Sequence, residues 1–295
     1  MRIRTVLMLV LSALALVLVL VLSACGASSV KSSVDPVAVA AEKTVTAQTV
    51  HVSMTMSEEA SSLPAPFTIA ADGVEDFANR RAAMNMDMSA LASLTGGRLG
   101  SPDDWKIETV MDGLTIYMHA PFFQTALKLD KPWVKIDMEN VGKQAGLNLS
   151  SLMSYDPTQW TQYLDYLRGS EGAVVMGHEL VRGVLTMHYE ASVDFDAYLN
   201  SLSGERRSAA KAALDKLNEL GKPQYGPFEV WVDAQGRIRQ ETFDYSIDSG
   251  NSSVGSVKTS FKLEFYDYDV PVSITIPSPD QVVDLMQVAG SLGNG

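Results

Sequence analysis

Short stretches in which apolar and polar residues alternate recur along this chain of 295 residues, and they constrain its fold more than any other feature. Within the stretch 50–57, Val50, Val52, Met54 and Met56 fall on one side of an extended backbone, and polar residues fall on the other. The same alternation returns in the stretches 84–88, 134–138, 185–190, 228–233 and 261–265, and glycine-containing turn sequences stand at 112–113 and 233–236. Half-polar strands joined by tight turns predict an antiparallel sheet with one covered face and one face in water.

Three segments show helical spacing instead. Asp35 and Pro36 open the first, which is predicted to run to about residue 49, and the others cover about 156–168 and 204–220. The stretch 89–104, rich in glycine and turn residues, is predicted to be a long loop. No internal repeat and no domain boundary follow residue 35. The pattern therefore predicts one α+β domain, a strongly curved antiparallel half-barrel with helices packed on its concave face.

The N-terminal end has the layout of a secretory signal peptide. Arg2 and Arg4 precede an apolar run over residues 6–22, and two small residues separate that run from Cys25, the only cysteine of the chain. The apolar run is only slightly shorter than a membrane span, so a retained transmembrane anchor is the alternative interpretation.

The sequence around Cys25 resembles the lipobox of bacterial lipoproteins. In that family the thiol receives a diacylglyceryl group, the preceding segment is removed, and acyl chains such as palmitate hold the protein on the membrane. The resemblance implies a signal peptide over residues 1–24, an acylated cysteine with a flexible tether over 25–34, and a single exported domain over 35–295. The domain is then expected in the cell envelope, on the outer face of the cytoplasmic membrane.

Charge and cysteine content narrow the function further. The formal net charge is −12, and it becomes −14 when the two arginines of residues 1–24 are removed. Nucleic acid is excluded as a partner because no basic patch is present, and adhesion to anionic lipid headgroups is disfavoured for the same reason. A lone cysteine forms no intramolecular disulfide, so the core alone must hold the fold.

Three stretches resemble, in their order and spacing, the LppX/LprG group of envelope lipoproteins, which also includes LprA and is related to the LolA and LolB carriers. They are residues 156–167, 176–189 and 265–277, and the resemblance spans about residues 36–285. It implies a LolA-like half-barrel of about eleven antiparallel strands wrapped around helices. It also implies an apolar cavity that holds the acyl chains of a lipid or glycolipid, with no catalytic residues.

Methionine is prominent among the apolar strand positions. The chain has 14 methionines, and this unbranched, polarizable side chain adapts to occupants of variable shape. The residues predicted to line a ligand cavity are Met54, Met56, Met84, Met86, Met88, Met118, Ile136, Met138, Met187, Val230 and Leu263. The alternative interpretation is that these side chains are ordinary core.

A lid over the cavity mouth is predicted from the helix at 156–168 and the apolar, loop-like segment 142–154 before it. Its residues would be Leu149, Leu152, Met153, Trp160, Leu164 and Leu167. The alternative is a helix that simply packs on the sheet, and the two interpretations are compatible.

Signals of catalysis or metal binding are missing from the sequence. His51 and His188 fall on polar strand faces, His119 at a strand end and His178 in a turn, and none has zinc-ligand spacing. No nucleophile elbow, phosphate-binding loop or dinucleotide-binding motif occurs. Asp267 and Asp269 are predicted to share the face of a solvated strand edge. Glu58 and Glu59 are predicted to form a charged strand end or turn. No metal, no cofactor and no enzymatic activity are therefore expected.

These observations favour a lipid-anchored, non-catalytic carrier or binding protein for an apolar ligand. The first alternative is a scaffold or partner-binding lipoprotein with a closed core, and the second is an envelope hydrolase. The expected partners are the membrane, through acylated Cys25, a lipid or glycolipid ligand, and an envelope transporter. The protein itself is expected to be a monomer.

Overall fold

The structure, a computed structural model, describes most of the chain after residue 34. The described residues are 35–44, 46–60, 65–94, 100–127, 129–144, 170–193, 222–248 and 256–285, together with individual residues between 196 and 215.

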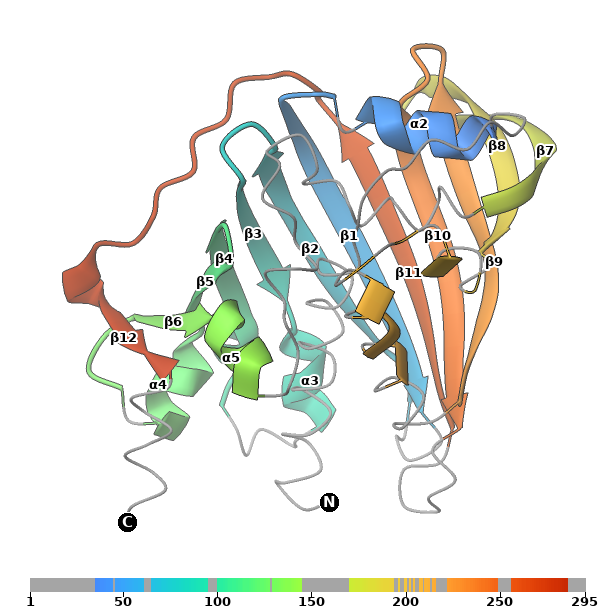
Figure 1. Ribbon diagram of the computed structural model, residues 1–295. Helices are drawn as coiled ribbons and strands as arrows, with labels where there is room; N and C mark the ends of the chain where they lie inside the picture. The colour runs from blue at the N-terminus through green and yellow to red at the C-terminus, as the bar shows by residue number, and fades with distance from the viewer. Residues whose placement is uncertain are drawn as a thin grey trace.

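Twelve strands in this part of the chain form one curved sheet (Figure 1). They are β1 (Thr49–Ala60), β2 (Phe67–Asp76), β3 (Arg81–Asp87), β4 (Lys106–Asp112), β5 (Thr115–His119), β6 (Trp133–Asp137), β7 (Ser170–Val181), β8 (Val184–Val193), β9 (Lys222–Asp233), β10 (Ile238–Asp248), β11 (Ser256–Tyr266) and β12 (Val282–Asp284). Their spatial order is β12-β6-β5-β4-β3-β2-β1-β11-β10-β9-β8-β7, and every neighbouring pair is antiparallel except β12 with β6. The predicted α+β class and curved antiparallel sheet are confirmed, with twelve strands in place of about eleven.

Four helices and two short 3₁₀ segments accompany the sheet among the described elements. They are α2 (Pro36–Thr44), α3 (Ser89–Leu94), α4 (Pro121–Leu127), α5 (Met138–Gln144), η1 (Pro102–Trp105) and η3 (Pro279–Gln281). Helix α2 contacts β7, β9 and β10, α3 contacts β2, and α5 contacts β6. Figure 1 shows α2 near the ends of the strands in one half of the sheet and α3 and α5 in front of the other half. We call the face that carries these helices the inner face.

Helix α2 begins as predicted and ends earlier. The Asp35 carboxylate accepts a hydrogen bond from the backbone N–H of Val37 at 2.9 Å, as an N-cap does. Val37 and Ala40 are buried in the main core. The helix ends at Thr44 rather than at residue 49, because the strand pattern of β1 already governs the backbone from Thr49.

The prediction of a loop over residues 89–104 is wrong. Helix α3 occupies its start and η1 its end. Leu91 and Ala92 are buried in the main core, and this burial stabilises a short helix that its own length would not support. Trp105, fully buried at the end of η1, stacks on Phe122 of α4 with ring centroids 4.4 Å apart.

The other two predicted helices differ in outcome. The helix predicted at 156–168 lies outside the described residues. All described residues between 204 and 215 are helical, which supports the helix predicted at 204–220 over that part. Ala210 is buried there in a second core cluster with Met138 and Leu202.

Close backbone approach and bulges bend the sheet. A Cβ on Gly73 would lie 2.3 Å from the carbonyl oxygen of Ala83, so only glycine fits at this position, where β2 pairs with β3. The pairing of β9 with β10 shifts register between Ile238 and Gln240 and again between Phe243 and Tyr245. Such bulges increase local twist and bend, which helps the sheet to curve around its inner face.

Both predicted hairpin turns are present. Gly113 joins β4 to β5 with φ of +58°, and Gly236 joins β9 to β10 with φ of +79°. These left-handed conformations favour glycine, which is why both turns could be predicted from the sequence.

Candidate functional site

Every second side chain of the strands points to the inner face, and the strand register aligns them in rows. One row consists of Met86, Ala71, Met54, Leu263, Glu241, Val230 and Tyr189. The next consists of Ile69, Met56, Phe261, Phe243, Phe228 and Ala191. In this second row, Phe228 and Phe261 stack on either side of Phe243 with ring centroids 5.0 and 4.8 Å away. The rows form a wide apolar surface that crosses most of the sheet.

The structure brings most of the predicted cavity residues onto this surface. Those with inner-face strand positions are Met54, Met56, Met84, Met86, Met118, Ile136, Met187, Val230 and Leu263. Met88 directly follows β3 and is buried in the same core. The strand position predicted for Met138 is wrong, because this residue begins α5 and packs there with Met111 and Ile116.

Burial on the inner face is uneven. Val50, Met56 and Val230 have no exposed surface. Met84 and Leu263 lie in the same face and pack on the core, yet both remain only partly buried. Within the described residues, part of the apolar inner face is therefore only partly covered.

Three carboxyl side chains interrupt the apolar surface. Glu58 of β1, Glu75 of β2 and Glu241 of β10 occupy inner-face positions, paired across the strands with Phe67, Ala82 and Val230 respectively. At the paired inner-face positions of β1–β6 and β8–β11 no lysine, arginine or histidine occurs. These paired inner-face positions are therefore apolar and acidic.

Loss of hydration changes the acidity of two of these groups. Glu58 is 7% exposed, and burial raises its pKa to about 7. Burial likewise raises the pKa of Glu75 to about 7. The expectation of a charged strand end is therefore wrong for Glu58, which points inward, and it holds only for exposed Glu59.

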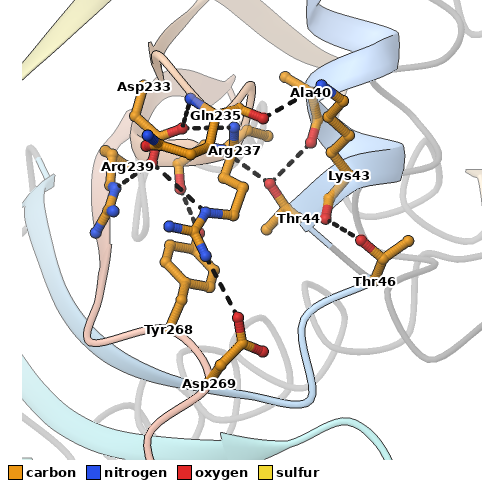
Figure 2. Close-up of polar contacts among 11 residues, drawn as sticks. Ala40, Lys43, Thr44, Thr46, Asp233, Gln235, Arg237, Arg239, Tyr268 and Asp269 are labelled. Atoms are coloured by element: carbon orange, nitrogen blue, oxygen red, sulfur yellow. Dashed lines mark hydrogen bonds and ion pairs between the residues drawn. The ribbon is translucent and has the colours of Figure 1, made fainter.

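A polar cluster fastens α2 to the hairpin between β9 and β10 (Figure 2). The Asp233 side chain has no exposed surface, and its carboxylate accepts hydrogen bonds from the backbone N–H groups of Gln235 and Arg237, each at 2.9 Å. The Lys43 ammonium donates to the Gln235 carbonyl at 3.2 Å, and the Thr44 hydroxyl accepts from the backbone N–H of Ile238 at 2.8 Å. The Asp233 bonds close the turn between β9 and β10, and the Lys43 and Thr44 bonds join α2 to that hairpin, so the cluster has a structural role.

Asp269 belongs to this cluster, since the Arg237 guanidinium donates to its carboxylate at 3.4 Å, and neither Asp267 nor Asp269 lies in a strand. Strand β11 ends at Tyr266, and the two aspartates adopt left-handed conformations with φ of +48° and +61°. The prediction that they share a strand face is wrong. Asp269 instead accepts a hydrogen bond from the backbone N–H of Gln48 at 2.9 Å. Tyr268, between the two aspartates, is buried and donates to the Ile238 carbonyl, and burial raises its pKa.

His178 of β7 pairs with inner-face Met187, and the other three histidines lie away from the inner face. His51 and His188 occupy outer-face strand positions and His119 ends β5, as predicted, whereas His178 lies within β7 and not in a turn. His188 stacks on Trp231 at 4.1 Å, and Glu179 accepts a hydrogen bond from the Trp231 indole at 2.8 Å. Among the described residues no three His, Cys, Asp or Glu side chains are grouped as metal ligands.

The predicted lid and anchor fall where the structure gives no description. Leu149, Leu152, Met153, Trp160, Leu164 and Leu167 lie outside the described residues, as does Cys25. In the segment 142–154, which was predicted to be loop-like, Gly142 belongs to α5 and is therefore helical. Within the described chain, no helix combines the length and apolar character needed to cross a bilayer.

No protein-family model matches the chain, and no curated protein matches it. Solved structures similar to it include the lipoprotein LppX of Mycobacterium tuberculosis, with a TM-score of 0.44 and 15% identity over 82% of this chain and 100% of that one. LprF of Mycobacterium bovis has a TM-score of 0.42 and 14% identity over 82% of this chain and 95% of that one. A LolA-superfamily protein of Nitrosomonas europaea has a TM-score of 0.28 and 9% identity over 85% and 96%. LppX, whose group the three sequence stretches resemble, is thus one of the structures similar to this chain.

Proposed function

We propose that this chain is a lipid-anchored, non-catalytic carrier or binding protein that holds the acyl chains of a lipid or glycolipid against its inner face. The observation that carries the proposal is the incomplete cover of that face, where Met84, Ile136 and Leu263 keep exposed apolar surface beside fully buried neighbours. Apolar surface left open to water on a concave sheet favours an apolar ligand that completes its burial.

The energetics of such a ligand are favourable. Each methylene that leaves water contributes about 0.8 kcal/mol, so about ten shielded methylenes provide on the order of 8 kcal/mol before the cost of association. The methionines Met54, Met84 and Met86 supply adaptable contacts along the strands. Affinity would come from the tails, and the choice of headgroup from polar groups at the rim.

The location follows from the N-terminal sequence. Acylation of Cys25 would tie the domain to the outer face of the cytoplasmic membrane, within reach of envelope lipids. A monomer that exchanges its lipid with an envelope transporter fits this placement.

The scaffold alternative predicts an inner face completely covered by the protein. Partly buried Met84 and Leu263 favour the carrier over this alternative, because they show that the described part of the inner face is not completely covered.

Native mass spectrometry of protein purified without detergent tests the proposal. We expect co-purifying lipid on the wild type and a clear loss of lipid from Leu263→Trp, whose indole would occupy the uncovered part of the inner face. Lys262→Trp is the matched control, since Lys262 is the neighbouring residue on β11 and is exposed on the outer face. A homogeneous, lipid-free wild type that takes up no added lipid would overturn the proposal.

A further inference from the structure

Exposed large apolar side chains are concentrated on one hairpin. Val174, Val175, Met176 and Leu180 of β7 and Leu185 of β8 are each between 53% and 69% exposed. We call these five residues the hairpin patch. Elsewhere in the described chain, the only exposed large apolar side chains are Tyr225 and Val270.

Irregular pairing produces the patch. The register between β7 and β8 shifts between Glu171 and Val174 and again between Val175 and Gly177, so three successive apolar side chains are left at the surface. Strand β7 also ends the sheet, with no further strand beside it among the described residues. Edge strands usually carry charged side chains that prevent association, so a long apolar edge strand indicates an interaction surface.

The charged groups nearest to the end of the hairpin are turned away from the patch. Glu179 binds the Trp231 indole on the outer face, and the Arg182 guanidinium lies 3.1 Å from the Glu264 carboxylate and 4.1 Å from the centre of the Tyr266 ring. Leu180 and Leu185 pair directly across the hairpin between them. The charges of Glu179 and Arg182 are therefore engaged by other residues and do not face the apolar side chains of the hairpin patch.

The N-terminal anchor enters the domain beside the patch. The Asp35 carboxylate accepts a hydrogen bond from the backbone N–H of Ala173 at 3.3 Å, and Ala173 directly precedes Val174. Residues 26–34, which separate Asp35 from Cys25, span at most about 30 Å when fully extended. Whether Cys25 is acylated or the apolar run before it is retained, the membrane lies within that distance of the patch.

We propose that the hairpin patch is a bilayer-docking surface, which inserts its apolar tips into the lipid interface beside the chain's own anchor. The short tether keeps the patch at a high effective concentration near the bilayer, so weak apolar insertion suffices. Because the chain is acidic, anionic headgroups contribute no attraction. Leu185 also lies on the same side of β8 as Met187 and Tyr189, so the docked patch adjoins the inner face.

This inference rests on the proposed membrane anchoring, and a depth measurement tests it. The full-chain lipoprotein is placed in phosphatidylcholine vesicles with and without brominated acyl chains. The variant Val175→Cys carries an environment-sensitive thiol probe, and Ala70→Cys is the control, because Ala70 is exposed on the outer face of β2, six strands from β7. We expect at least twofold quenching of the probe at position 175 and none at position 70. Adding Leu180→Glu and Leu185→Glu to Val175→Cys should abolish the quenching while the anchored protein still floats with the vesicles.

The outcomes separate docking from carriage. Equal quenching at both positions, or none at position 175, overturns the docking surface. A blue-shifted probe that brominated lipid does not quench also overturns it, since a second copy or a peptide would then cover the edge. If mass spectrometry of the same protein finds bound lipid but the probe at position 175 is not quenched, only the docking proposal is contradicted. Quenching without bound lipid supports docking and contradicts the carrier proposal.

Discussion

At the scale of single residues, the sequence predicts the apolar side chains of the inner face but not its carboxyl groups. The alternation of Met54 and Met56 with polar neighbours predicts their inward positions, because a strand has a period of two. The inward positions of Glu58 and Glu75 were not predicted, since a carboxyl is normally found in water. One signal was available for Glu75, which continues the alternate positions of Ile69 and Ala71 along β2.

Glu58 gives a pH-dependent stability whose sign follows from its raised pKa. In the folded state the Glu58 carboxyl keeps its proton up to about pH 7, because its pKa is about 7. In the unfolded chain its pKa is near the ordinary value of 4.5, and the proton is lost there. Its contribution to stability is thus fully present below about pH 4.5 and is lost as pH rises toward and through 7. Glu58→Gln should raise the unfolding free energy at pH 8 by about 1–3 kcal/mol and change it little at pH 4.5. Urea denaturation at both pH values measures this, with Glu59→Gln as the exposed neighbour control. An equal effect of Glu58→Gln at both pH values would contradict the assignment.

Gly73 gives a second prediction at this scale. A methyl group there would collide with the backbone of β3, so Gly73→Ala should lower the unfolding free energy by about 2 kcal/mol or more. Gly226→Ala is the comparison, because its nearest contact, to the Asp244 carbonyl oxygen, would be 3.3 Å and needs only a small adjustment. Thermal unfolding of the two variants should rank Gly73→Ala as clearly less stable, and a reversed order would refute this explanation of the bend.

At the scale of elements, strong periodicity was sufficient for prediction and weak periodicity was not. Strands β1 and β11 alternate regularly and were predicted. Strand β2 was not, because Ala71, Gly73 and Glu75 hide its apolar face. The left-handed turn after β11 was mistaken for a strand, since a positive φ at Asp267 leaves the alternation of residue types intact. Tertiary burial, and not local sequence, decided the presence of α3.

The attachment of α2 to β10 gives a prediction at this scale. Thr44→Val keeps the side-chain shape but removes the acceptor for the buried backbone N–H of Ile238, so the unfolding free energy should fall by about 1–3 kcal/mol. Thr46→Val is the matched control, because the Thr46 hydroxyl is exposed and bonds only locally to the Lys43 carbonyl (Figure 2). It should change stability by no more than about 0.5 kcal/mol. Urea denaturation compares the two, and equal losses would show that the Thr44–Ile238 bond has no special role.

At the scale of the whole molecule, we expect the proposed anchor and the fold to be separable. Cys25→Ser should leave the unfolding transition of the domain unchanged while it stops processing of the N-terminal segment or releases the protein from membranes. Membrane fractionation with intact-mass measurement checks this. Retention of an unprocessed chain in the membrane with wild-type efficiency would favour the transmembrane alternative over acylation.

The two ends of the sheet are unlike, and this difference limits self-association. One end finishes in β12, which spans only Val282–Asp284, and the other finishes in the twelve-residue β7. Among the described strands, β12 offers little backbone for pairing, so β7 is the one long strand with an unpaired edge. Away from a membrane, two copies that pair through their β7 edges would form a symmetric dimer with no long described edge left over. Even at high protein concentration, association through this edge should therefore stop at two copies and not propagate into fibres.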